Sequence, residues 1–253
     1  MSYKSRDLLK PQGVFSNKIG HSSQKFPNHS DGLGLTSQRQ RQRMVEQLQL
    51  NGIKHPAVLA AMMQVPRHQF VDAALASRAY ENDALPIGYG QTISQAFIVA
   101  KMMELALGTT DASSPPHRWL EIGTGCGYQA AVMAQLAKQV LSIERLQPLY
   151  ERAQKNLLSL ALENLWTYHG DGLLGLPKYA PYDAIVVAAA GLSIPCALTE
   201  QLAIGGKLII PVQEHRQQNL MVIHRQSQDR YVRQTIARVR FVPLLSGVVD
   251  NVR

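Results

Sequence analysis

The chain has 253 residues, 45% of them hydrophobic, and a formal net charge of +8. That length and composition predict one folded, enzyme-sized domain. Apolar runs stay well short of the roughly 18 residues that cross a bilayer, and the N-terminal residues lack the apolar core of a signal peptide, so we expect a cytoplasmic protein that does not contact membranes. Two isolated cysteines and eight scattered histidines argue against a disulfide framework and against a metal site.

The positive charge lies mainly in residues 1–43, which include a predicted basic leader over residues 1–37. Residues 1–43 contain eight Lys or Arg and two Asp. The leader is rich in Gly, Ser, Asn and Gln and is too polar to build a core, so we expect it to be solvated and flexible. The alternative is an arm that binds a partner or nucleic acid. Because the rest of the chain has little excess charge, we expect no specific nucleic-acid binding.

Residues 38–108 are expected to form a mainly helical segment on the substrate side. The patterns RMVEQLQLNGI and HPAVLAAMMQV predict two short amphipathic helices, and a third is expected over residues 98–107 with Gly108 after it. The stretch GYGQTISQAF, residues 88–97, precedes this third helix and contains no acid or base. Taken alone, it predicts a flexible loop in which Ser94 caps the helix.

Residues 117–253 are expected to form an α/β core. Short apolar strands separated by helices are predicted at residues 119–123, 140–144, 165–169, 182–190 and 206–212. The segments YQAAVMAQLAKQ, LQPLYERAQKNLLSLAL and IPCALTEQLAI predict the helices. LMVIHR and YVRQTIARVRFV predict antiparallel strands at one edge. The pattern is typical of a doubly wound, Rossmann-like, mostly parallel sheet, within a single domain of residues 38–253.

The most specific motif is LEIGTGCGYQAA, which places three glycines between a predicted strand and a predicted helix. Glycine there permits a tight turn and lets a ligand lie against bare backbone. A dinucleotide-binding turn would need a further glycine where this chain has Tyr128. The spacing G-x-G-x-G, preceded by Glu121, resembles the first motif of S-adenosylmethionine-dependent methyltransferases. An NAD-dependent dehydrogenase is the alternative within this fold.

Acidic residues at two further strand ends support a nucleoside cofactor. Glu144 lies 21 positions beyond Gly123, where a carboxylate can accept hydrogen bonds from both ribose hydroxyls. Asp171 could reach an adenine amino group, and Gly172 adds no side chain to the wall of the site. Each feature alone also fits an ordinary turn or a solvated strand end. Together they predict a cofactor site of Glu121, Gly123, Thr124, Gly125, Gly127, Glu144, Asp171 and Gly172.

The blocks PRHQFV (66–71), AYENDALPIGYGQTIS (79–94) and WLEIGTGCGYQAA together resemble the protein-L-isoaspartate O-methyltransferase family. YDAIVVAAA, LAIGGKLIIPV and VRFVPL extend the resemblance over about residues 38–245. It implies a repair enzyme that transfers a methyl group from S-adenosylmethionine to the free carboxylate of L-isoaspartyl residues in damaged proteins and peptides. S-adenosylhomocysteine is the implied product, and the ester closes to a succinimide whose hydrolysis returns some aspartate. We expect a monomer.

The resemblance also implies that Ser94 is the catalytic residue, with the adjoining Gln91, Thr92 and Ile93 in contact with substrate. A carboxylate nucleophile has an ordinary pKa near 4 and is ionised at pH 7, so the lack of a general base in this stretch is expected. Three residues depart from the pattern of many relatives, which have Pro, Thr and Thr in place of Ala96, Ala188 and Leu245.

Two other functions stay open. A different methyl acceptor, such as a small metabolite or RNA, would use the same fold with a repurposed loop. Alternatively, the chain could bind the cofactor without turnover, with the leader as an interaction arm.

Overall fold

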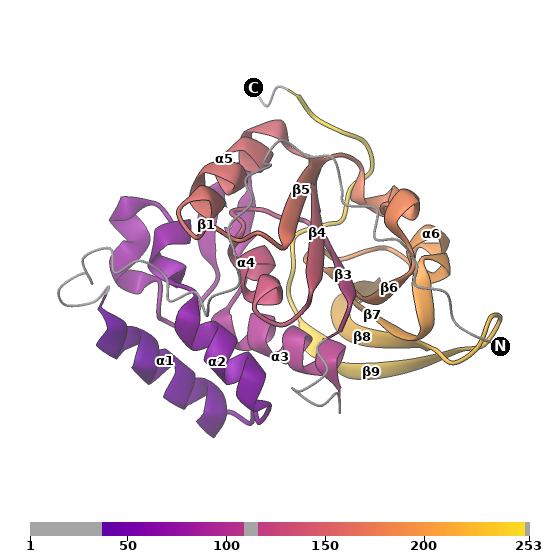
Figure 1. Cartoon of the computed structure of the whole chain (residues 1–253), viewed down its shortest axis with the longest axis horizontal. Coiled ribbons are helices and arrows are strands. Elements are labelled where there is room, and N and C mark those ends of the chain that lie inside the picture. The colour runs from indigo at the N-terminus through magenta and orange to yellow at the C-terminus, as the bar shows by residue number, and fades with distance from the viewer. Residues whose placement is uncertain (1–36, 109–115, 251–253) are drawn as a thin grey trace.

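The computed structural model describes residues 37–108 and 116–250, so the predicted leader lies outside the described residues up to residue 36. Figure 1 shows strands fanning across the centre and right of the view, with the N-terminal helices at lower left. Within the described residues, no helix is both long and apolar enough to cross a membrane. No group of three or more His, Cys, Asp or Glu side chains there is arranged to hold a metal ion.

The central sheet has seven strands in the order β5-β4-β3-β6-β7-β8-β9. Pairing is parallel from β5 through β7 and antiparallel for β8 and β9, which confirms the predicted fold class. The strands are β3 (Arg118–Ile122), β4 (Gln139–Glu144), β5 (Leu165–His169), β6 (Tyr182–Val187), β7 (Leu202–Glu214), β8 (Gln217–Arg225) and β9 (Tyr231–Val239).

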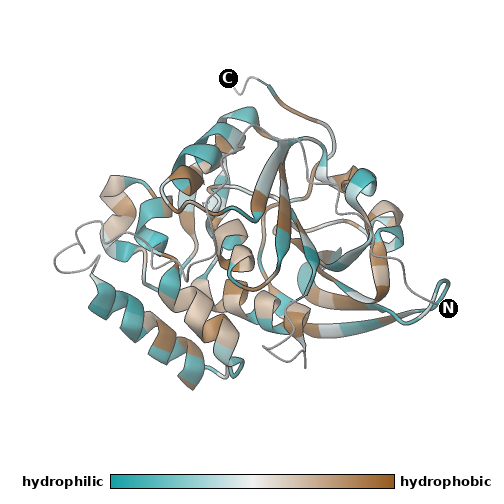
Figure 2. Cartoon of the chain, viewed as in Figure 1, coloured by the Kyte–Doolittle hydropathy of each residue, from teal (hydrophilic) through white to brown (hydrophobic). Residues whose placement is uncertain are grey.

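Both faces of the sheet are buried, which explains why its inner strands are almost continuously apolar. Along β3, Trp119 belongs to one hydrophobic core, whereas Leu120 and Ile122 belong to the core on the opposite face. Figure 2 shows hydrophobic residues concentrated along the sheet, whereas helix α1 is mostly hydrophilic. The larger core runs from Met44 in α1 to Val222 in β8, so the helical segment and the sheet share one interior.

The helices of the core are shorter than the sequence predicts. They are α4 (Tyr128–Ala134), α5 (Gln147–Leu158) and α6 (Cys196–Glu200), with 3-10 turns η4 (Gly172–Leu174) and η5 (Pro177–Tyr179). The Asn164 side-chain amide donates to the carbonyls of Ala134 and Ala137 and satisfies the end of α4 there. The segment after α6 enters β7 because Leu202 pairs with Tyr182. Short apolar runs of this kind suit a strand as well as a helix.

The N-terminal segment contains helices where the sequence predicts them. It also contains a small hairpin that the sequence did not predict. Its elements are α1 (Gln38–Leu50), α2 (Pro56–Gln64), η2 (Arg67–Phe70), η3 (Ala73–Arg78), β1 (Leu85–Gly88), β2 (Gln91–Ile93) and α3 (Ala96–Leu107). The strands β1 and β2 pair antiparallel, so GYGQTISQAF is largely ordered hairpin rather than loop. Gly88, Tyr89 and Gly90 at its tip all have positive φ. The two glycines adopt this conformation without strain, whereas it is uncommon for a residue such as Tyr89.

The predicted helix cap at Ser94 is wrong. Helix α3 has Gln95 at its N-cap position, and no side chain of that residue caps the helix. The Oδ1 atom of Asn82 instead accepts a hydrogen bond from the backbone N–H of Phe97 at 3.1 Å. Because a distant side chain satisfies this free N–H group, the Ser94 hydroxyl is not needed for capping.

Candidate active site

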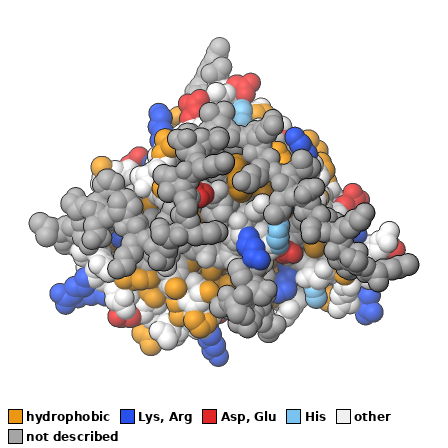
Figure 3. All heavy atoms as spheres, viewed as in Figure 1, with side chains coloured by type: hydrophobic (Ala, Val, Ile, Leu, Met, Phe, Trp, Pro, Cys, Tyr) orange, Lys and Arg blue, Asp and Glu red, His pale blue; other side chains and the backbone are white. Residues whose placement is uncertain are grey.

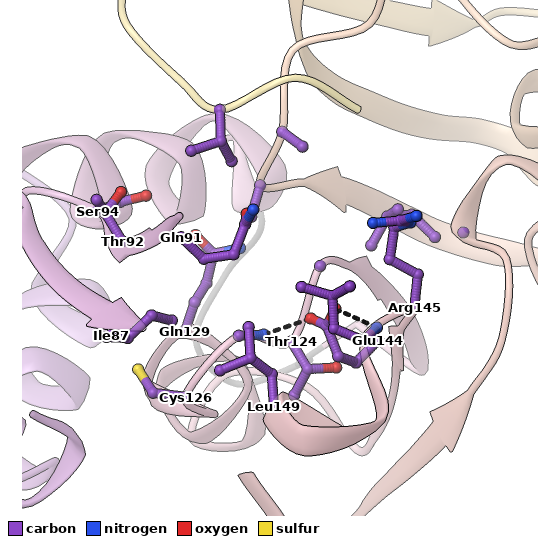
Figure 4. Close-up of a pocket in the computed structure, with 18 of the residues that line it drawn as sticks. Ile87, Gln91, Thr92, Ser94, Thr124, Cys126, Gln129, Glu144, Arg145 and Leu149 are labelled. Carbon is purple, nitrogen blue, oxygen red and sulfur yellow. Dashed lines mark hydrogen bonds between the residues drawn. The ribbon is translucent and has the colours of Figure 1, made fainter. Parts of the chain in front are cut away.

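A pocket opens at the carboxyl ends of β3, β4 and β6. It encloses about 840 Å³ of empty space, part of it open to solvent. Its walls come from the hairpin, the glycine turn between β3 and α4, the end of β4, and residues 242–245 after β9. Figure 4 shows Ser94 and Thr92 on one side of this space and Glu144 and Arg145 on the other. Segments far apart in the sequence therefore meet at one site.

The glycine turn holds a backbone conformation that other residues rarely adopt. Gly123, Gly125 and Gly127 have φ values of 92°, 56° and 92°. The N–H groups of Gly123 and Thr124 both donate to the carbonyl of Ile143, at 2.8 and 3.2 Å. These bonds fix the turn against β4. Gly123, Thr124 and Gly125 line the pocket as expected, whereas Gly127 packs behind it against Leu157.

Glu144 places a carboxylate in the pocket wall at the end of β4. Its side chain is 5% exposed. Oε2 accepts the N–H of Gly125 at 2.8 Å, and Oε1 accepts the N–H of Leu146 at 2.9 Å; both bonds are drawn in Figure 4. A carboxylate offers about four lone-pair positions, so each oxygen retains capacity for another donor. That arrangement suits a ligand with two adjacent hydroxyls.

Glu121 lies beneath the turn and does not line the pocket. It is fully buried, and the Ser142 hydroxyl donates to Oε2 and also contacts the hydroxyl of Thr124. Oε1 has no hydrogen-bond partner among the described residues. Burial raises the pKa of Glu121 to about 8, although the contacts with Ser142 and Gln129 oppose this rise. The side chain is therefore mainly protonated at neutral pH in this structure.

Asp171 is placed outside the pocket wall, whereas Gly172 lines it. The carboxylate of Asp171 accepts the N–H groups of Leu173 at 2.9 Å and Gly247 at 2.6 Å. A Cβ atom on Gly172 would lie 2.3 Å from Cγ2 of Ile122. Glycine is therefore required here by close packing against β3.

All four residues of QTIS line the pocket on the side opposite Glu144. Gln91, Thr92 and Ile93 form β2, and Ser94 follows it directly. The carbonyl of Ser94 accepts a hydrogen bond from Nη2 of Arg67 at 2.7 Å. The structure thus brings the predicted substrate residues and most of the predicted cofactor residues to one cavity.

Sequence reasoning missed Gln129, which also lines the pocket. This side chain is 7% exposed, and neither Nε2 nor Oε1 meets hydrogen-bond geometry with a partner among the described residues, although the amide lies near enough to the Glu121 carboxyl to lower its pKa. Buried polar groups normally have partners, so an unsatisfied amide facing a cavity indicates a ligand contact. The signal in the sequence is one polar residue within the helix YQAAVMA, every residue of which is buried. Two of the departing residues, Ala188 and Leu245, line the same pocket.

The model of the family described as Protein-L-isoaspartate(D-aspartate) O-methyltransferase (PCMT) matches residues 39–249. The chain belongs to this family. Proteins named protein-L-isoaspartate O-methyltransferase from Burkholderia mallei and Burkholderia pseudomallei are 55% identical over 221 residues, which cover 87% of this chain and 67% of theirs. The family predicted from the sequence is thereby confirmed.

Solved structures agree with the family in fold. A structure named protein-L-isoaspartate O-methyltransferase is 27% identical, has a TM-score of 0.73, and is matched over 82% of this chain and 67% of its own. A putative protein-L-isoaspartate O-methyltransferase from Plasmodium falciparum, in complex with S-adenosyl-L-homocysteine, has a TM-score of 0.71 at 24% identity, over 81% of this chain and 98% of its own. The similarity to the Plasmodium falciparum structure shows that the two proteins share a fold.

Proposed function

We propose that this pocket transfers a methyl group from S-adenosylmethionine to the free carboxylate of L-isoaspartyl residues in damaged proteins and peptides. The family and its reaction are those predicted from the sequence. The observation that carries the assignment to this pocket is that one cavity joins the Glu144 carboxylate and the glycine turn to the QTIS segment. A cofactor and an acceptor carboxylate can therefore meet within it.

The residues present fit S-adenosylmethionine, which supplies an electrophilic methyl group when bound. Glu144 has free lone pairs for a ribose, and the apolar side chains of Ile143 and Leu149 offer walls for a ring. The unsatisfied amide of Gln129 offers one donor group and one acceptor for the amino-acid end. With Gln129 added, the proposed cofactor contacts are Gly123, Thr124, Gly125, Gln129, Glu144 and Gly172, whereas contacts from Glu121 and Gly127 stay predictions because neither residue lines the pocket. The adenine contact of Asp171 stays a prediction, since backbone N–H groups hold its carboxylate outside the pocket wall.

Ser94 is proposed to orient the acceptor. Its hydroxyl can donate to one oxygen of the isoaspartyl carboxylate and leave the other oxygen free to attack. No proton must be removed, because the carboxylate is ionised at neutral pH. The chain's contribution is mainly to hold the reacting groups in line. Gln91, Thr92 and Ile93 are proposed to contact the peptide around the damaged residue.

We further propose that residues 38–253 act as one cytoplasmic, monomeric domain without a specific nucleic-acid site. Residues 38–108 would supply the substrate side, and residues 117–253 would supply the cofactor core. One hydrophobic core contains residues from both ranges, which supports a single domain. Lys/Arg and Asp/Glu side chains are interspersed over the described surface visible in Figure 3. An interspersed surface gives less attraction for a polyanion than a basic stripe does. Deleting residues 1–37 should leave the peptide-methylating activity within about twofold.

The proposed function is tested by following one isoaspartyl peptide by mass spectrometry in the presence of S-adenosylmethionine. The account expects a methyl ester first, then a succinimide, and then a mixture of aspartyl and isoaspartyl forms. An RNA sample and a mixture of small metabolites are run in parallel. Methylation of either of these, with the peptide unchanged, would favour a different acceptor.

A further inference from the structure

Arg67 is a buried cation that has no acidic partner among the described residues. The residue is 0% exposed. Nε donates to the carbonyl of Ala79 at 2.8 Å, and Nη2 donates to the carbonyls of Asp83 at 3.3 Å and Ser94 at 2.7 Å. Nη1 has no hydrogen-bond partner, and no Asp or Glu side chain in the described part of the chain forms an ion pair with Arg67. Its partners among the described residues are therefore neutral carbonyl groups and the Tyr128 side chain, none of which carries a negative charge.

This guanidinium lies directly behind two walls of the pocket. It holds the carbonyl of Ser94, and its Cζ atom lies 4.9 Å from the centre of the Tyr128 ring. Ser94 and Tyr128 both line the pocket. Phe70 packs edge-on against the same Tyr128 ring. Arg67 itself does not line the cavity, but two residues that it contacts, Ser94 and Tyr128, do.

Stability alone does not account for this charge. Burying an unpaired cation costs several kcal/mol, and apolar residues of similar volume often replace buried ionic groups without loss of stability. Burial lowers the pKa of Arg67, although the contact with Tyr128 opposes this fall, and arginine side chains stay protonated in proteins. A clamp on three carbonyl groups would need only neutral donors. Since no described carboxylate balances the charge, a bound anion is the partner that would do so.

We propose that Arg67 is a positioning residue that selects the charged acceptor: its field favours a carboxylate at Ser94, and its hydrogen bond fixes the backbone there. This inference rests on the proposed function, which brings an isoaspartyl carboxylate to the same cavity. Charges inside a protein are screened less than charges in water, so the attraction acts through the intervening protein. Bound substrate supplies the anion that Arg67 otherwise lacks.

The test compares two peptides that differ only in charge at the damaged residue. One is the isoaspartyl peptide, and the other is its isoasparaginyl analogue, an uncharged amide used as a competitor. Their affinities are measured in the wild type and in Arg67→Gln, which keeps hydrogen-bond donors but removes the charge. We expect the preference for the charged peptide to fall at least tenfold in the variant, while S-adenosylhomocysteine affinity stays within about threefold. An equal loss of affinity for both peptides would overturn the proposal.

Two further measurements keep the inference separate from folding and from the proposed function. If Arg67→Gln does not fold, Arg67→Ala is assayed with added guanidinium or urea: rescue by guanidinium alone supports a role for charge, and equal rescue by urea contradicts it. The wild type is assayed first on the isoaspartyl peptide. Failure there removes the proposed function, whereas normal wild-type activity with an unchanged charge preference in Arg67→Gln removes only this inference.

Discussion

The carboxylate of Glu144 accepts the backbone N–H of Gly125 at 2.8 Å. This bond joins the end of β4 to the glycine turn after β3, two segments that meet only in the folded sheet. The acid proposed to bind ribose and the loop that approaches the cofactor are therefore held as one unit. A change in Glu144 should disturb both.

Glu144→Gln should weaken S-adenosylhomocysteine binding by about tenfold or more, since about 1.4 kcal/mol corresponds to a factor of ten and bonds to charged groups contribute about 1.5–3 kcal/mol. The amide has one acceptor oxygen where two backbone N–H groups now bond. Isothermal titration calorimetry measures the change. Glu151→Gln, on the exposed side of α5, is the matched control and should bind normally. Equal affinity in both variants would argue against a ribose contact at Glu144.

Ser94→Ala should lower turnover of an isoaspartyl peptide by about 100-fold, the lower end of the range of about 100- to 1000-fold seen when one positioned donor is removed from an active site. S-adenosylhomocysteine affinity should stay within a few fold, because Ser94 lies on the opposite side of the pocket from Glu144. Steady-state kinetics with the peptide give the turnover. Ser159→Ala, at the exposed end of α5, is the control and should be fully active. Unchanged turnover in Ser94→Ala would remove its catalytic role.

Gln129→Met should raise the melting temperature of the ligand-free protein while reducing the stabilisation that S-adenosylhomocysteine provides. An unsatisfied buried polar group costs about 1–3 kcal/mol, and a methionine of similar size removes that cost together with the ligand contact. Thermal unfolding with and without the ligand tests both effects. Gln42→Met, on the exposed face of α1, should change neither. A less stable ligand-free Gln129→Met protein would contradict this account.

Glu121→Gln should flatten the dependence of stability on pH. The pKa of Glu121 rises from 4.5 to about 8 on folding, so between those values the folded state holds a proton that the unfolded state has lost. The free energy of unfolding therefore falls as pH rises, by up to about 1.4 kcal/mol per pH unit. This penalty is absent below pH 4.5 and complete above pH 8. Urea unfolding from pH 5 to 8 should favour the variant increasingly; parallel profiles would show that Glu121 ionises normally.

The sheet and the glycine turn could be predicted because their signals are local. Three closely spaced glycines and an acid at the next strand end suffice for Gly123, Gly125 and Glu144. The failures arise from contacts between distant residues. Asn82 caps α3 in place of Ser94, and Gly247, 76 residues away, holds Asp171. Local sequence patterns do not predict hydrogen bonds between residues so far apart in the chain.

The burial of individual polar residues could not be predicted from the sequence either. The sequence PRHQFV gives no sign that its arginine is enclosed, since charged residues are almost always exposed unless paired. Gln129 does carry a weak signal as a polar residue in an apolar helix. Only the packed structure shows that its amide is enclosed near Glu121 and lines the same cavity as Ser94.

The most direct test of the central claim is a competition between matched isoaspartyl and aspartyl peptides for labelled methyl groups from S-adenosylmethionine. The account predicts rapid label on the isoaspartyl peptide, little on the aspartyl peptide, and loss of that label in Ser94→Ala. Equal labelling of both peptides, or label on neither, would contradict it.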